Sequence, residues 1–183
     1  LMKRALTHAG ELSSDLQQIL HRKKNFMQEQ KFFAIISRMK YINRWGLMRN
    51  TINENISEHS LETAFIAHVL ALYRNVRFGG NVDPERAALL AMYHDATEKI
   101  TGDLPTPVKY YNADIKAEYD KVEKMAEEKL LSYLPEDLRE YYAPLFSKTE
   151  EDKELWVLVK AADKLSALIK CCLLYTSPSP RDA

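Results

Sequence analysis

Histidine and aspartate side chains recur at three separated places in this sequence, and together they could bind a divalent cation. His94 and Asp95 are adjacent, His59 lies upstream of them, and Asp163 lies far downstream. Two imidazoles and two carboxylates offer mixed nitrogen and oxygen ligands, which suit Mn, Co, Fe, Zn or Mg. The order His, His-Asp, Asp therefore predicts a site for one divalent metal ion, built from segments that are distant in the chain.

Glu98 follows His94 by four residues, a spacing that places both side chains on one face of a continuous helix. The same face continues an apolar stripe through Ala87, Leu90 and Ala91 into the expected interior. Ionisable groups are costly to bury without a partner, so these side chains need compensation, which a cation supplies. The alternative is a helix end where the stripe emerges into solvent and where a histidine suits the helix dipole.

Asp163 lies on the same helical stripe as Leu155 and Val159, a position at which an unpaired carboxylate is unfavourable. The alternative is a surface ion pair with Lys160 or Lys164, which would contribute little to stability. Asp163 alone does not indicate a metal site. Together with the two histidines and Asp95, it completes a set of four residues that can bind a divalent cation.

Helical patterns dominate the chain, and no sustained alternation of β-branched residues indicates strands. We therefore predict an all-α fold, a helical bundle of five or six main helices with the metal site at its centre. The main helices are expected over about residues 32–43, 57–73, 84–99, 108–134 and 151–172.

Two of the expected helices have recognisable beginnings. Ser57 is the expected N-cap of the second helix, and Asp83 followed by Pro84 begins the third. The second helix is apolar on opposite sides, which predicts that it is buried centrally. Residues 101–107 hold two prolines and a glycine and are expected to form a loop.

The composition excludes several classes of protein. The 183 residues suit one domain, and Lys+Arg and Asp+Glu are equal at 26 each, which argues against a protein that coats nucleic-acid polymers. No segment is long and apolar enough to cross a membrane. The two cysteines are adjacent and form no disulfide framework, which fits a reducing compartment and predicts a cytoplasmic protein.

The order of the four ligands resembles the HD-domain metal-dependent phosphohydrolases, and the flanking residues narrow the resemblance. They are similar to one branch, the bacterial YfbR-like 5′-deoxynucleotidases, over about residues 32–170. Several motifs agree in order and spacing. The matching stretches are Ser37–Trp45, Glu54–Leu61, Ala91–Glu98 and Thr101–Tyr110, with Ile100 in place of a leucine before the last.

The resemblance implies a phosphoric monoester hydrolase, a homodimer that converts deoxyribonucleoside 5′-monophosphates to deoxyribonucleosides and phosphate. It also implies a role for each motif. The metal ligands would be His59, His94, Asp95 and Asp163. The catalytic residues would be Glu98, Arg44 and Asp95. The substrate contacts would be Arg44, Trp45, Asp95, Asp103, Leu104, Pro105, Thr106 and Asp163.

The resemblance also divides the chain into three regions. Residues 1–30 have no counterpart in it and are expected to be an N-terminal extension, with the natural chain beginning at Met27. Residues 31–172 are the expected HD domain, truncated at its C-terminal end relative to the family. Residues 173–183 end in a Ser-Pro tail without an apolar period, which predicts disorder and a segment foreign to the natural protein.

Other functions stay open on the residues alone. Another HD-domain enzyme could cleave a nucleoside triphosphate, an alarmone or a cyclic dinucleotide, although a triphosphate or an alarmone should need more cations near the metal than Arg44 and Lys109 offer. A non-catalytic HD-like ligand-binding module is a further alternative, against which the complete ligand set and Glu98 argue. Arg44 and Trp45 could also be a helix end and a core aromatic, rather than contacts to phosphate and sugar.

Overall fold

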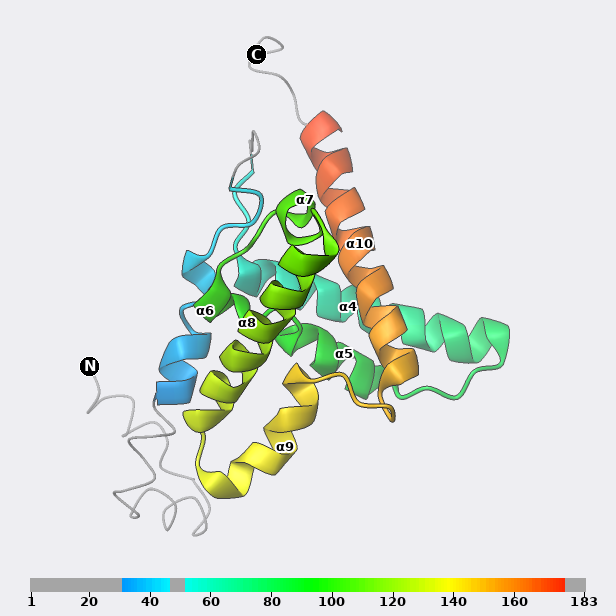
Figure 1. Cartoon of the computed structure of the whole chain (residues 1–183). Helices are drawn as coiled ribbons and strands as arrows, with labels where there is room; N and C mark the ends of the chain where they lie inside the picture. Colours follow the sequence, from blue (N-terminus) through cyan, green and yellow to red (C-terminus); the bar gives the residue numbers. More distant parts are fainter. Residues whose placement is uncertain (1–30, 47–51, 177–183) are drawn as a thin grey trace, which may run out of the picture.

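The structure is a computed structural model that describes residues 31–46 and 52–176 (Figure 1). Within these ranges it is helical, with one isolated β-bridge between Asn43 and Asn55 and no strand, so the predicted all-α fold is confirmed. The predicted N-terminal extension and the end of the predicted tail lie outside the described residues. The elements are η1 (Met39–Tyr41), α4 (Ile56–Phe78), α5 (Pro84–Tyr93), α6 (Glu98–Thr101), α7 (Thr106–Lys109), α8 (Ala113–Ser132), α9 (Glu136–Phe146) and α10 (Lys153–Thr176).

Helix α4 packs against both α5 and α10 and forms the centre of the fold. Figure 1 shows α4 crossing behind α10, with α5 beside it. The buried side of α4 carries the small residues Ala64, Ala67 and Ala71, which allow the helices to approach closely. A second core cluster joins the N-terminal segment to α8 and α9. Its members are Phe32, Met39, Ile56, Ala96, Leu130, Leu134 and Phe146.

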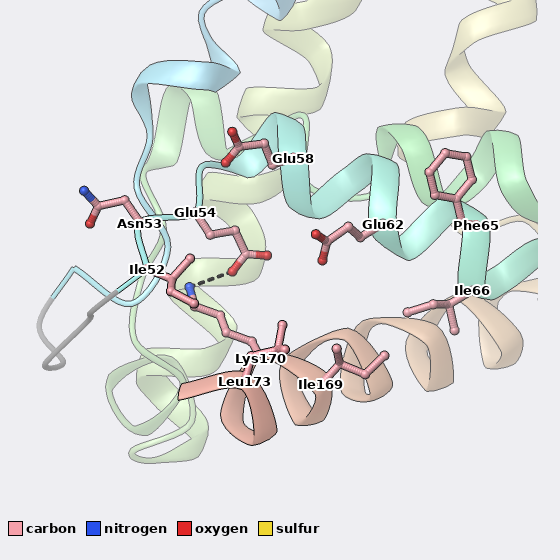
Figure 2. A pocket seen from close by; sticks show the side chains of 10 residues that line it. All are labelled: Ile52, Asn53, Glu54, Glu58, Glu62, Phe65, Ile66, Ile169, Lys170 and Leu173. Atoms are coloured by element: carbon pink, nitrogen blue, oxygen red, sulfur yellow. Dashed lines mark ion pairs between the residues drawn. The ribbon is translucent and has the colours of Figure 1, made fainter. Parts of the chain in front are cut away.

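The prediction that α4 is buried on all sides is wrong. Leu61 is 47% exposed and Phe65 is 66% exposed, because α5 and α10 both pack on the alanine side of the helix. Between this exposed side and the C-terminal part of α10 lies a cavity of about 600 Å³ (Figure 2). Apolar side chains such as Ile66, Ile169 and Leu173 line it, together with the charged pair Glu54 and Lys170.

The start of α4 also differs from the prediction, since its N-cap is Asn55 and not Ser57. The Asn55 side chain accepts hydrogen bonds from the backbone N–H groups of Ser57 and Glu58. The Glu58 carboxylate in turn accepts from the Asn55 N–H, which completes a capping box. This cap fixes the first turn of α4, where His59 lies.

The third helix begins as predicted, because the Asp83 side chain accepts a hydrogen bond from the Arg86 N–H and Pro84 occupies the first turn. It ends at Tyr93 and not near Lys99, so the predicted continuous helix is wrong. Residues 94–97 form a turn in which Ala96 N–H bonds to Tyr93 O and Glu98 N–H bonds to Asp95 O. In a regular helix the side chains of consecutive residues point in different directions. The turn allows the side chains of His94 and Asp95 to approach each other.

The remaining elements are also fixed by identifiable local contacts. The predicted loop at residues 101–107 ends in the short helix α7, whose Pro107 lies in the first turn, where a missing N–H is tolerated. The Asn112 side chain caps α8 by accepting from Ile115 N–H. Arg86 on α5 pairs with Asp152 just before α10, at 2.6 Å between Nη2 and Oδ2. None of the described helices combines the length and the apolarity that a membrane span requires.

Candidate metal-binding site

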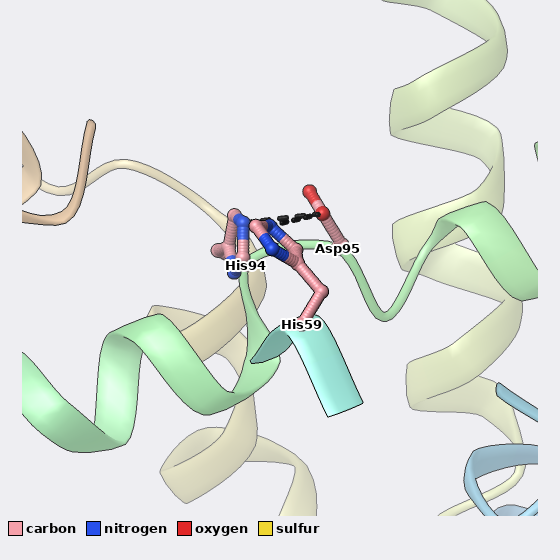
Figure 3. Close-up of side chains that lie close together, drawn as sticks. All are labelled: His59, His94 and Asp95. Carbon is pink, nitrogen blue, oxygen red and sulfur yellow. Dashed lines mark ion pairs between the residues drawn. The ribbon is translucent and has the colours of Figure 1, made fainter. Parts of the chain in front are cut away.

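The predicted ligands converge where α4, α10 and the turn after α5 meet. His59 lies in the first turn of α4, and His94 and Asp95 lie in the turn after α5. Figure 3 shows these three side chains pointing toward one another. One ligand atom from each lies within 4.8 Å of the others, a grouping that can hold a metal ion.

Asp163 reaches this group from α10. Its Oδ1 lies 3.1 Å from His59 Nε2, and the same nitrogen lies 3.5 Å from Asp95 Oδ2. His94 Nε2 is 3.1 Å from Asp95 Oδ2. Asp163 also accepts from the Arg44 guanidinium at 3.5 Å, so it faces the site and Arg44. The structure therefore brings the four predicted residues together from three parts of the fold.

The orientation of the two imidazole rings suits metal binding. His94 Nδ1 donates to the backbone carbonyl of Ala91 at 2.7 Å, which leaves Nε2 directed at the carboxylates. This buried Nε2 contacts Asp95 Oδ2 at 3.1 Å without the geometry of a hydrogen bond. His59 is fully buried, and its Nδ1 lies 3.2 Å from Ser166 Oγ. In metal sites one ring nitrogen commonly binds the ion while the other donates to a protein acceptor, and both rings fit that arrangement.

The carboxylates of the site are ionised at neutral pH. Burial would raise the pKa of Asp95, but the charges of His94, His59 and Arg44 lower it to about 2. The pKa of Asp163 is also lowered, since its hydrogen bond with His59 and the charge of His94 outweigh burial. Burial alone would lower the pKa of His94, yet Asp95 and the Ala91 carbonyl raise it. The site thus favours positive charge, which fits a divalent cation.

Glu98 lies in the first turn of α6, beside this group. Burial raises its pKa to about 9, and the negative charges of Asp95 and Asp103 add to the effect. Its Oε2 is buried and has no hydrogen-bond partner in the part of the chain that the structure describes. A carboxyl group in such surroundings can exchange a proton near neutral pH once positive charge is added nearby.

A pocket of about 1130 Å³ opens next to Arg44 and Asp163. The backbone of Trp45 has a positive φ of 58°, which is uncommon for a bulky residue and occurs often at binding sites. Asp103 fixes this backbone conformation, because its carboxylate accepts a hydrogen bond from the Trp45 N–H at 3.2 Å. The predicted substrate contacts that line the pocket are Arg44, Trp45, Asp103, Leu104, Pro105, Thr106 and Asp163.

Some neighbours of the site do not appear in the prediction. Ser166 and Lys170 lie on α10 three and seven residues after Asp163, so the helical period could have indicated that they share a face. Glu54 contacts His59 from the segment before α4, and no sequence pattern marks that contact. Lys160 and Lys164 line the pocket and add two cations near Arg44.

Comparisons with known proteins show which family the chain belongs to. A family model described as 5′-deoxynucleotidase YfbR-like matches residues 31–175. A 5′-deoxynucleotidase from Erwinia tasmaniensis is 57% identical over 145 residues, which cover 79% of this chain and 73% of that protein. A 5′-deoxynucleotidase YfbR from Escherichia coli is 56% identical over the same shares. The crystal structure of an HD-domain phosphohydrolase from Listeria innocua has a TM-score of 0.67 at 22% identity, covering 77% of this chain and 67% of that one, which shows a shared fold.

Proposed function

Because this chain belongs to the 5′-deoxynucleotidase YfbR-like family, we infer that it is a metal-dependent 5′-deoxynucleotidase. The reaction is the hydrolysis of a deoxyribonucleoside 5′-monophosphate to the deoxyribonucleoside and inorganic phosphate, catalysed by a phosphoric monoester hydrolase. The observation that carries the conclusion is the match over residues 31–175, with 57% identity to a 5′-deoxynucleotidase. The convergence of two histidines and two aspartates supports it independently.

We propose that His59, His94, Asp95 and Asp163 are the metal ligands. A divalent cation held there, whether Co, Mn, Mg, Zn or Fe, would polarise the phosphoryl group and lower the pKa of a water molecule. Asp95 and Asp163 stay ionised, so they would hold the cation, and through it the phosphate would be positioned relative to the two histidines. Arg44 lines the pocket beside Asp163, where its guanidinium can donate to phosphate oxygens and stabilise their charge.

The remaining predicted residues bind the sugar and move the proton. The Asp103–Thr106 segment and Trp45 form the wall of the pocket next to Arg44, where a deoxyribose would lie. Glu98 is proposed to orient the attacking water and to exchange a proton with it or with the leaving oxygen. Lys160 and Lys164 also line this pocket from α10. The sequence prediction counted only Arg44 and Lys109 as cations near the metal, and the structure adds these two lysines.

We expect the protein to prefer dAMP over AMP by about 10- to 100-fold in kcat/KM. The physical reason is that Trp45, held in place by Asp103, presents a rigid wall that an added 2′-hydroxyl would meet. Asp103 can also accept a hydrogen bond from the 3′-hydroxyl, so 3′-monophosphates should be poor substrates. Phosphate release measured over a panel of dAMP, AMP, 2′-deoxyadenosine 3′-monophosphate and dATP checks this expectation.

Two outcomes of that panel would lead to different conclusions about the substrate. Equal kcat/KM for dAMP and AMP would refute the sugar preference but leave a 5′-nucleotidase. A triphosphohydrolase would release triphosphate and not phosphate from dATP, so the dATP reaction is followed as deoxyadenosine formed. Faster formation of deoxyadenosine from dATP than from dAMP would favour that activity, for which Lys160 and Lys164 supply cations. A Trp45→Ala variant should reduce the preference for dAMP over AMP and retain hydrolysis of both, because the metal ligands are unchanged.

We also propose that the protein is a cytoplasmic homodimer. The exposed side of α4 supports a dimer, because it presents a long run of apolar side chains to solvent. Its members are Leu61, Phe65, Val69, Leu72, Tyr73 and Val76. Sedimentation at micromolar concentration distinguishes a dimer from a monomer, and a single monomeric species would refute this proposal.

A further inference from the structure

Glu54 is a buried carboxylate that contacts two parts of the site at once. It is 8% exposed and lies immediately before the cap of α4. Its Oε1 lies 3.6 Å from His59 Nδ1 and 3.7 Å from Arg44 Nη1. The same Arg44 nitrogen touches His59 Nδ1. A guanidinium cannot accept a hydrogen bond, and neither can a ring nitrogen that carries a proton, so Glu54 is an acceptor that both can share.

Lys170 holds the other oxygen of this carboxylate. Its Nζ lies 2.6 Å from Glu54 Oε2, and the side chain is 8% exposed (Figure 2). A buried lysine is unfavourable without an opposite charge, so this pair is mutually dependent. The Nζ also lies 4.6 Å from the centre of the Trp45 ring, a cation–π distance. One cation on α10 therefore touches Glu54 and the aromatic wall of the substrate pocket.

We propose that Glu54 and Lys170 form a positioning pair for the reaction. The Glu54 carboxylate, 3.6 Å from His59 Nδ1, favours a proton on that nitrogen through its charge, beside the Ser166 hydroxyl at 3.2 Å. A proton on Nδ1 leaves Nε2 free to face Asp95 and Asp163, and the same carboxylate restrains the Arg44 guanidinium. Lys170 fixes Glu54 and supports the Trp45 ring. This inference rests on the proposed roles of His59 and Arg44. Acceptors of this kind behind a metal-ligating histidine typically change metal affinity or activity by about 10- to 100-fold when removed.

The alternative is that the pair only joins the segment before α4 to α10 and stabilises the fold. The two roles separate in a double-mutant cycle. Glu54→Gln leaves the buried Lys170 without its carboxylate, and Lys170→Met leaves Glu54 with only the longer Arg44 contact, so each should lower the melting temperature. The double variant removes both charges, so its melting temperature should return toward that of the wild type. A positioning role predicts that metal affinity and catalysis do not return with it.

The experiment measures Mn²⁺ dissociation constants by calorimetry, and kcat and KM for dAMP, on the wild-type chain, the three variants of the cycle and two control variants. We expect Glu54→Gln and the double variant to bind Mn²⁺ about 10- to 100-fold more weakly and to lose a similar factor in kcat/KM. Lys170→Arg, which keeps the cation, should retain most of both. Asp152→Asn is the matched control, because it breaks the buried pair with Arg86 away from the site and should affect only stability.

Recovery by the double variant decides the question. Mn²⁺ affinity within about threefold of the wild type would overturn the role assigned toward His59. Recovery of kcat/KM to the same degree would overturn the role assigned toward Arg44 and Trp45. If the wild-type chain binds Mn²⁺ but releases no phosphate from dAMP, the proposed function fails, while the Mn²⁺ affinities still test the pair.

Discussion

Replacement of Asp163 by alanine is expected to abolish phosphate release from dAMP and to lower the metal content of the purified protein. Asp163 Oδ1 lies 3.1 Å from His59 Nε2, and its carboxylate is ionised at neutral pH because His59 and His94 lower its pKa. Loss of this ligand leaves a site with few substitutes, so the cation is bound weakly or in the wrong geometry. The same result is expected for alanine at His59, His94 and Asp95.

His68 provides the matched control for these variants. It lies on α4 two and a half turns after His59, is half-buried and does not belong to the ligand group. His68→Ala should therefore retain metal and activity while it tests whether loss of any α4 histidine damages the protein. Metal analysis and phosphate release are measured on the same samples, with circular dichroism as the test of folding. Normal metal content together with full activity in Asp163→Ala would refute the ligand assignment.

Replacement of Glu98 by glutamine is expected to lower kcat by about 10²–10⁴-fold while metal and dAMP binding are kept. Glutamine can still hydrogen-bond to water but cannot exchange a proton. Burial, together with the charges of Asp95 and Asp103, raises the pKa of Glu98 to about 9, so positive charge added nearby would let it exchange its proton closer to neutral pH. KM should change little, which is the pattern expected when an interaction is made mainly in the transition state.

A second carboxyl group controls for neutralisation alone. Glu127 on α8 also has a pKa raised by burial, and it accepts a hydrogen bond from Ser147 outside the site. Glu127→Gln should leave kcat unchanged. The pH dependence of kcat should lose one limb in Glu98→Gln and keep both limbs in the control. Near-normal kcat in Glu98→Gln would remove Glu98 from the mechanism, and loss of metal from that variant would make it a ligand.

The sequence was sufficient to predict which residues meet at the site. Helical periodicity placed His94 and Asp163 on inward-facing stripes, where the cost of burial indicated that they need partners. His59 and Asp95 were assigned by the order of the four residues and by the family resemblance. The all-α fold followed from the same periodicity. The Asp103–Thr106 loop could be predicted as a wall of the site because its motif is specific, and the structure places it at the pocket beside Trp45.

Other features depend on tertiary contacts that no local pattern encodes. The helix break after Tyr93 lets the adjacent His94 and Asp95 approach to 3.1 Å, whereas the pattern indicated an unbroken helix. The side of α4 that is buried is the one with alanines, since close packing with α5 and α10 outweighs the larger apolar residues. Glu54 and Lys170 are 116 residues apart in the sequence (170 − 54), and only the fold shows that they form an ion pair.

Metal titration of the wild-type chain tests the central claim most directly, namely that phosphate release requires one divalent cation at His59, His94, Asp95 and Asp163. The protein is first stripped with a chelator, and Mn²⁺ or Co²⁺ is then added in steps while phosphate release from dAMP is followed. We predict no release before addition and a rise that saturates at about one equivalent per chain, as a single four-ligand site requires. Undiminished release in the presence of the chelator, or saturation only at two equivalents, would contradict that claim.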